Sequence, residues 1–181
     1  MLRDSTLCDF GWTAPGFELP DAHGQMHSMA QHLTDKGLLI AFICNHCPYV
    51  IAIAERLAAD AQQLMDDGIG VLAIMSNDFH NYPADAPDQM IEFAAGYNFP
   101  FPYLVNEDQE VARAYDAQCT PDFFGLNGKG TLQYRGRLDD ARMGDGSDRN
   151  AELVNAMRQI AQTGSGPREQ TPSMGCSIKW R

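Results

Sequence analysis

Residues 38–50 read LLIAFICNHCPYV, and the architecture of the chain can be worked out from this stretch. Residues 38–43 form an uninterrupted apolar run, which is typical of a strand buried on both faces of a sheet. From Ile51 to Asp67 apolar residues recur at helical spacing, and Gly68 ends the run. The segment therefore predicts a buried strand, a turn that carries two cysteines, and an amphipathic helix.

The same kinds of element continue on both sides of this stretch. Strands and helices that alternate and then end in a hairpin and a helix indicate the α/β class, with a central mixed β-sheet flanked by helices. Residues 17–27 predict an N-terminal β-hairpin extension of that unit. The further predicted elements are a short helix at 28–33, strands at 69–75 and 103–105, helices at 90–97, 107–117 and 151–162, and a hairpin at 123–135.

We expect one domain over residues 1–181, because this length is typical of a single domain. With 44% hydrophobic residues the chain can bury a core without disulfide bonds. After Thr163 the composition shifts to Gly, Ser, Pro, Glu and Gln. Residues 164–181 are therefore predicted to form a C-terminal surface tail.

The charge balance argues against two classes of partner. Thirteen basic and 24 acidic residues give a formal net charge of −11, which repels nucleic acid and anionic membranes. No apolar run approaches the roughly 20 residues of a membrane helix. The opening residues, MLRDSTLCDFGW, lack the apolar region of a signal peptide. We expect a cytoplasmic protein.

The five cysteines carry the strongest chemical signal. In a reducing compartment, cysteines that are not simply buried serve catalysis, redox sensing or metal binding. Cys44 and Cys47 are spaced as CxxC between the buried strand and the helix. This spacing allows a small disulfide loop, and a helix N-terminus stabilises a thiolate. We predict that Cys44 is the nucleophile, that Cys47 resolves the mixed disulfide, and that His46 lowers the pKa of Cys44.

A lone CxxC is also half of a zinc site. Such a site needs four ligands, and the chain has no second CxxC, although His46 and Cys119 are available. A strand, a CxxC and a helix in that order favour redox chemistry. We expect neither a metal nor a cofactor.

A second signal is Cys119-Thr120-Pro121, directly before the apolar pair Phe123-Phe124. A proline that opens a strand is a candidate for a cis peptide bond, although a trans proline at an edge strand is the commoner case. Beside the CxxC, Thr120 and Pro121 would form a substrate face, with the main-chain groups of Thr120 free to pair with an extended substrate. Cys119 and Cys176 are candidate accessory thiols, and inert packing is the alternative for Cys119.

Taken together, these pieces make the sequence similar to the thioredoxin superfamily, and within it to the peroxiredoxin-like redoxin (AhpC/TSA-type) group that carries a CxxC. The resemblance implies a thioredoxin-like fold, in which Pro121 is a cis-proline facing the CxxC. The matching segments are Ala14–Phe17, Phe42–Val50, Cys119–Phe124, Tyr134–Asp140 and Gly175–Trp180.

The resemblance also bears on the reaction. Peroxiredoxins carry PxxxTxxC, and alignment on Cys47 places Ile40 and Cys44 at the proline and threonine positions. Thiol–disulfide exchange through Cys44 and Cys47 therefore fits better than peroxide reduction. Its partners would be protein or small-molecule disulfides and thiols, with an external thiol reductant. The alternatives are a thiol peroxidase that uses Cys47 against peroxide, and a metal-binding or redox-sensing protein.

A run of mixed charge follows the predicted hairpin. We interpret it as a solvated loop with ordinary surface ion pairs, and the alternative is a charged rim that selects a partner. Its members are Arg135, Arg137, Asp139, Asp140 and Arg142.

Overall fold

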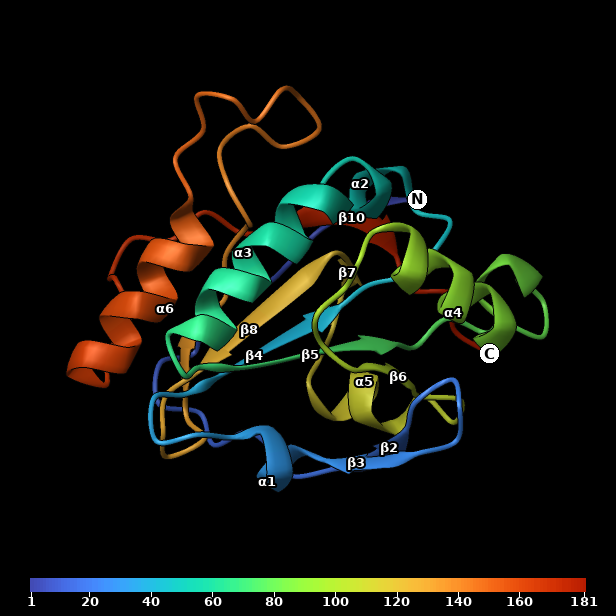
Figure 1. Cartoon of the computed structure of the whole chain (residues 1–181), viewed down its shortest axis with the longest axis horizontal. Coiled ribbons are helices and arrows are strands. Elements are labelled where there is room, and N and C mark those ends of the chain that lie inside the picture. Colours follow the sequence, from blue (N-terminus) through green and yellow to red (C-terminus); the bar gives the residue numbers. More distant parts are fainter.

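The computed structural model describes residues 1–181, and its centre is a five-stranded sheet with the order β6-β5-β4-β8-β9 (Figure 1). The strands are β4 (Leu38–Phe42), β5 (Gly70–Met75), β6 (Tyr103–Val105), β8 (Asp122–Leu126) and β9 (Leu132–Tyr134). β4, β5 and β6 are parallel neighbours, whereas β8 is antiparallel to both β4 and β9. The prediction of a central mixed sheet is confirmed.

Both faces of this sheet are buried, which explains the uninterrupted apolar run of β4. Successive side chains of a strand point to opposite faces. Leu39 and Ala41 accordingly belong to one apolar cluster, and Leu38 and Ile40 to another. β4 therefore contributes side chains to the apolar clusters on both faces of the sheet.

Helices cover each face of the sheet (Figure 1). α3 (Ala54–Asp66) and α6 (Glu152–Thr163) contribute buried side chains to the first cluster. α1 (Met29–His32) and α5 (Glu110–Ala114) contribute to the second cluster on the other face. α4 (Pro87–Gly96) lies at the β6 end of the sheet. This arrangement confirms the flanking helices that the alternating pattern predicts.

Several element bounds differ from the prediction. The helix expected from Ile51 begins earlier, as the single turn α2 (Pro48–Ile51), and α3 follows as a separate helix. The expected loop at 79–88 contains a 3₁₀ turn, η1 (Pro83–Asp85). The predicted N-terminal hairpin is present as β2 (Glu18–Pro20) and β3 (Met26–Ser28).

The C-terminal segment differs most from its expected form as a surface tail. Residues Met174–Ser177 form β10, which lies between β1 (Leu2–Asp4) and β7 (Cys119–Thr120) in a small antiparallel sheet. β10 also packs against α2. The sequence Met-Gly-Cys-Ser gives no local strand signal, and the strands that pair with it lie more than 50 residues away in the chain. The two ends of the chain thus meet beside the CxxC.

The mixed-charge run is only partly a solvated loop, because Asp140 and Arg142 are exposed but other members are buried. Arg135 is 6% exposed and Asp139 is 1% exposed. The guanidinium of Arg135 lies 3.1 Å from the buried carboxylate of Asp122, and both Arg56 and Arg149 donate to Asp139. The prediction missed these ion pairs because their partners lie elsewhere in the sequence.

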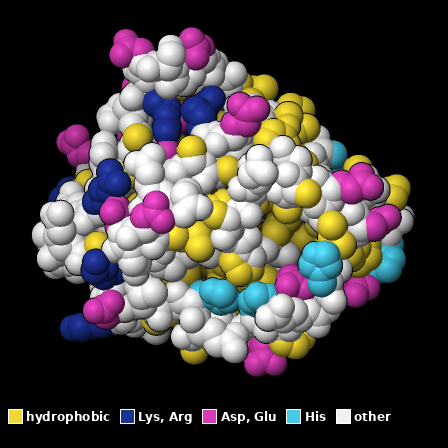
Figure 2. All heavy atoms as spheres, viewed as in Figure 1, with side chains coloured by type: hydrophobic (Ala, Val, Ile, Leu, Met, Phe, Trp, Pro, Cys, Tyr) yellow, Lys and Arg dark blue, Asp and Glu magenta, His cyan; other side chains and the backbone are white.

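Charge on the molecular surface is mixed. On the face drawn in Figure 2, basic side chains gather over the half that carries α6, whereas acidic side chains spread over the whole face. This face therefore presents no continuous basic patch.

None of the helices combines the length and apolar composition needed to cross a lipid bilayer.

Candidate redox site

The two CxxC cysteines lie where β4 leads into α2. Cys47 is the residue that precedes the first turn of α2, and Pro48 begins that turn. Cys44 is 1% exposed and Cys47 is 0% exposed, so both thiols are buried. A large partner therefore does not reach either sulfur directly in this structure.

Thr120 contacts both thiols from the opposite side. Its Oγ1 lies 3.3 Å from Cys44 Sγ, and its main-chain oxygen accepts a hydrogen bond from Cys47 Sγ at 3.1 Å. The Thr120–Pro121 peptide bond is cis, as the resemblance implied. β7 and β8 thus bring Thr120 and Pro121 to the CxxC across more than 70 residues of sequence.

The two thiols differ in their acidity. The pKa of Cys47 is lowered because Cys44 donates a hydrogen bond to it, with further support from Cys176 and Thr120. The pKa of Cys44 is raised by that same hydrogen bond, by burial, and by the negative charge of Asp85. This order is opposite to the expected one, in which His46 and a helix N-terminus lower the pKa of Cys44. Because α2 is a single turn, neighbouring donors matter more here than a helix dipole.

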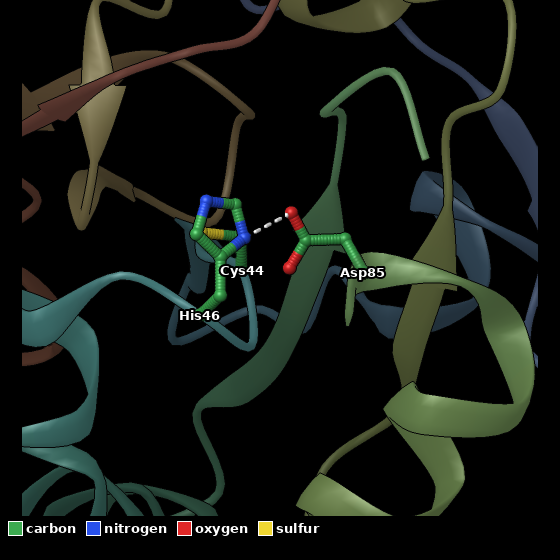
Figure 3. A group of neighbouring side chains, drawn as sticks. All are labelled: Cys44, His46 and Asp85. Atoms are coloured by element: carbon green, nitrogen blue, oxygen red, sulfur yellow. Dashed lines mark ion pairs between the residues drawn. The ribbon is translucent and has the colours of Figure 1, made fainter. Parts of the chain in front are cut away.

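Asp85 is the site residue that sequence reasoning missed. Its Oδ2 lies 2.7 Å from His46 Nδ1, and Figure 3 shows this ion pair with Cys44 beside it. The carboxylate is fully buried and accepts hydrogen bonds from Asn45 N and Asn77 Nδ2, each at 2.8 Å. Asp85 comes from η1, about forty residues away, in a stretch whose only local signal is that of a loop.

A sulfur, a nitrogen and an oxygen from Cys44, His46 and Asp85 lie within 4.8 Å of one another. Ligands that surround a metal at about 2.0–2.3 Å in a tetrahedral site stand farther apart than the 2.7 Å between His46 and Asp85. Both oxygens of Asp85 also accept hydrogen bonds already. The group is therefore arranged as a His–carboxylate pair beside a thiol.

The structure separates the two candidate accessory thiols. In the antiparallel pairing of β10 with β7, Cys176 is opposite Thr120, and it is one of the neighbours that lower the pKa of Cys47. Cys119 is fully buried, its Sγ donates to Pro121 O at 3.4 Å, and burial raises its pKa. Cys176 therefore joins the site, whereas Cys119 packs in the interior.

The same pairing corrects the expected substrate face. Thr120 was expected to leave its main-chain groups free for an extended substrate. β10 of the same chain pairs with β7 instead, with Cys176 directly opposite Thr120. A peptide can pair at this position only after β10 has moved away.

A cleft of about 280 Å³ borders the site. Tyr49 of α2, Pro121 and Met174 of β10 line it where it meets the CxxC region, and Arg137 and Arg142 lie on its wall. Neither Cys44 nor Cys47 lines this cleft.

The profile of the AhpC/TSA family matches residues 10–135, which include the CxxC, Thr120 and Pro121. No curated protein matches the chain significantly.

Three solved structures illustrate the range of similarity. An uncharacterized conserved protein from Geobacillus kaustophilus is 39% identical, with a TM-score of 0.93 over 100% of this chain and 97% of that chain. A hypothetical protein from Sinorhizobium meliloti 1021 is 38% identical, with a TM-score of 0.91 over 98% of each chain. A secreted disulfide oxidoreductase from Mycobacterium tuberculosis is 21% identical, with a TM-score of 0.56 over 65% of this chain and 80% of that chain, and this similarity concerns the fold alone.

Proposed function

The chain belongs to the AhpC/TSA family, and on that premise we propose that it is a thiol–disulfide oxidoreductase acting through a Cys44/Cys47 dithiol–disulfide couple. The observation that carries the proposal is the contact of Thr120 with the sulfurs of both CxxC cysteines. Cys47 has a lowered pKa and Cys44 a raised one, and Thr120 contacts both sulfurs. A two-step exchange requires one thiolate that attacks the disulfide and a second thiol that resolves the mixed disulfide.

We assign the attack to Cys47, and not to Cys44 as the motif alone suggested. The Cys47 thiolate attacks a disulfide, forms a mixed disulfide and releases the first thiolate. Cys44 then attacks the Cys47 sulfur, and its proton leaves with the second departing thiolate. Asp85 opposes early ionisation of Cys44, since its negative charge raises the pKa of that thiol. Cys44 therefore stays protonated until the mixed disulfide has formed.

The partners follow from the burial of the pair. We propose small disulfides as substrates that enter beside Pro121, whereas a protein disulfide that pairs with Thr120 would need β10 to move. An external thiol reductant returns the couple to its dithiol form. The lowered pKa of Cys47 stabilises the reduced protein, which makes the disulfide form the more oxidising one.

A thiol peroxidase is the second candidate, and one observation favours it. The threonine position of the peroxidatic motif holds Cys44, but the hydroxyl of Thr120 lies 3.3 Å from Cys44 Sγ and also lowers the pKa of Cys47. Thr120 thus offers a hydroxyl donor from another segment of the chain. In this reaction peroxide oxidises the Cys47 thiolate to a sulfenic acid, and Cys44 condenses with it to give a disulfide and water.

Rapid mixing of the reduced protein with hydrogen peroxide and, separately, with 2-hydroxyethyl disulfide distinguishes the two functions. The fluorescence of Trp12 and Trp180 follows the reaction, and mass spectrometry maps the product. Exchange predicts the faster reaction with the disulfide, a Cys44–Cys47 bond in Cys176→Ser, and no reaction in Cys47→Ser. Cys8→Ser is the matched control and reacts as wild type.

A faster reaction with peroxide and a transient sulfenic acid on Cys47 would make the protein a peroxidase. Stoichiometric metal in protein purified without a chelator, with no turnover of either oxidant, would instead favour the metal-binding alternative.

A further inference from the structure

We propose that Cys176 is a third redox thiol, which accepts the disulfide from Cys47 and presents it to the external reductant. β10, the strand that carries Cys176, occupies the place beside Thr120 that an extended substrate would take. The inference extends the proposed function and rests on it, because it adds a second disulfide, Cys47–Cys176, to the Cys44/Cys47 couple.

The strand pairing positions the Cys176 thiol. Residues directly opposite each other on antiparallel strands project to the same face of the sheet. Cys176 is opposite Thr120, and the Thr120 side chain contacts Cys44. The Cys176 side chain therefore projects toward the CxxC, and it packs against the apolar cluster that contains Cys44 and Cys47.

Gly175 allows β10 to approach this closely. A Cβ atom at position 175 would lie 2.0 Å from the main-chain oxygen of Thr120, a distance that no side chain tolerates without movement of the strand. On its outer edge, β10 pairs with β1, in which Leu2 is opposite Cys176. The segment is thus held on both edges with its thiol beside Cys47.

Exposure distinguishes Cys176 from the CxxC pair. Cys44 and Cys47 are buried, whereas Cys176 is partly exposed. A disulfide between Cys44 and Cys47 joins two buried residues, while a Cys47–Cys176 disulfide includes one residue that is partly exposed. Attack at the more accessible sulfur is the faster route to reduction.

In this reaction the small disulfide is the oxidant and the external thiol is the reductant. After the Cys47 thiolate has attacked a small disulfide, the Cys176 thiol displaces the second thiolate, which takes the Cys176 proton, and the Cys47–Cys176 bond forms. An existing Cys44–Cys47 disulfide is converted in the same way, with Cys44 as the leaving thiol. An external thiol then attacks Cys176 Sγ and releases the Cys47 thiolate. A second external thiol frees Cys176 and leaves as a disulfide with the first.

The test compares disulfide mapping and re-reduction in matched variants. Reduced protein is oxidised with one equivalent of 2-hydroxyethyl disulfide, quenched with N-ethylmaleimide and mapped by mass spectrometry. A second portion is re-reduced with glutathione. We expect a Cys47–Cys176 bond in wild type. In Cys176→Ser we expect only Cys44–Cys47, with re-reduction slower by about tenfold or more, while Cys8→Ser matches wild type.

Gly175→Ala tests the strand itself, because it keeps every thiol. We expect it to lose the Cys47–Cys176 bond and to be re-reduced as slowly as Cys176→Ser. Wild type that forms only Cys44–Cys47, with Cys176→Ser re-reduced at the wild-type rate, would overturn the inference and leave the proposed function intact. Failure to form either bond in wild type would overturn both.

Discussion

Cys47 Sγ lies 3.1 Å from the main-chain oxygen of Thr120, while the hydroxyl of the same threonine lies 3.3 Å from Cys44 Sγ. One residue thus contacts both thiols through different groups. In the thiol form Cys47 donates to the Thr120 carbonyl. Ionisation of Cys47 gives up that hydrogen bond, while hydrogen bonding with Cys44, Cys176 and Thr120 lowers the pKa of Cys47.

The hydrogen bond from Cys44 sets the acidity of Cys47, so its removal should be measurable. A lowered pKa means that the thiolate persists as the pH falls. Alkylation of Cys47 by iodoacetamide should therefore have its inflection below the ordinary thiol value of 9.0. In Cys44→Ala, which lacks the donor, we expect the inflection to move to higher pH.

Cys44→Ser is the matched control for this shift. It also lacks the second thiol, but its hydroxyl still donates, so its inflection should stay closer to that of wild type. Alkylation is followed at position 47 by mass spectrometry across a pH series. A common inflection in all three proteins would show that Cys44 does not stabilise the thiolate.

The Thr120 hydroxyl should contribute a smaller amount. Thr120→Val removes the hydroxyl and nearly preserves the shape of the side chain. Loss of one hydrogen bond costs about 1 kcal/mol, so we expect Cys47 to react about fivefold more slowly with 2-hydroxyethyl disulfide. Thr120→Ser keeps the donor and should react nearly as wild type. Stopped-flow fluorescence measures the rates, and equal rates for the valine and serine variants would exclude a role for the hydroxyl.

The ion pair between Arg135 and Asp122 should be important for folding. Asp122 is 0% exposed, and it also accepts hydrogen bonds from Ser5 Oγ at 2.6 Å and Gln118 N at 3.0 Å. Arg135→Leu leaves this carboxylate without its cation, and such a loss costs about 3–5 kcal/mol. Urea unfolding should report that decrease in the free energy of unfolding. The double variant Arg135→Leu, Asp122→Asn should recover much of it, and no recovery would assign the loss to packing of the arginine.

The pH dependence of Arg135→Leu follows from the same carboxylate. Burial raises the pKa of Asp122, and Arg135 opposes that rise. An acid whose pKa is higher in the folded state binds its proton more readily there, so folded-state stability increases as the pH falls through that pKa. We therefore expect the deficit of Arg135→Leu to be largest near neutral pH and to shrink toward acid pH. Unfolding curves at several pH values check this, and a pH-independent deficit would contradict it.

The sequence was sufficient for the parts of the site that are local. The apolar run of β4, the CxxC and the helical spacing after it lie within thirty residues, and the strand and the helix are confirmed. The position of Pro121 beside the CxxC was predicted from the resemblance. Residue spacing could not predict this contact, because it joins distant parts of the chain. Asp85 and the position of Cys176 could not be predicted, because they depend on how η1 and β10 dock.

The ion pairs of the charged residues could not be predicted from the sequence for the same reason. Arg135 and Asp139 resemble surface residues in a polar run, and only the fold brings Asp122, Arg56 and Arg149 to them. Acidity was misjudged for a related reason. The expectation for Cys44 used groups close in sequence, whereas the neighbours that act on the pair include Thr120, Cys176 and Asp85.

The sheet formed by β1, β10 and β7 has a practical consequence for handling the protein. Ser177 N donates to Met1 O at 2.8 Å, so the first residue is hydrogen-bonded directly to the strand that carries Cys176. A purification tag joined to Met1, or a protease that trims residues 1–4, would act on the edge of that strand. Assays of redox activity should therefore compare protein tagged at a surface loop with protein tagged at the N-terminus, since the position of the tag alone can change the measured rate.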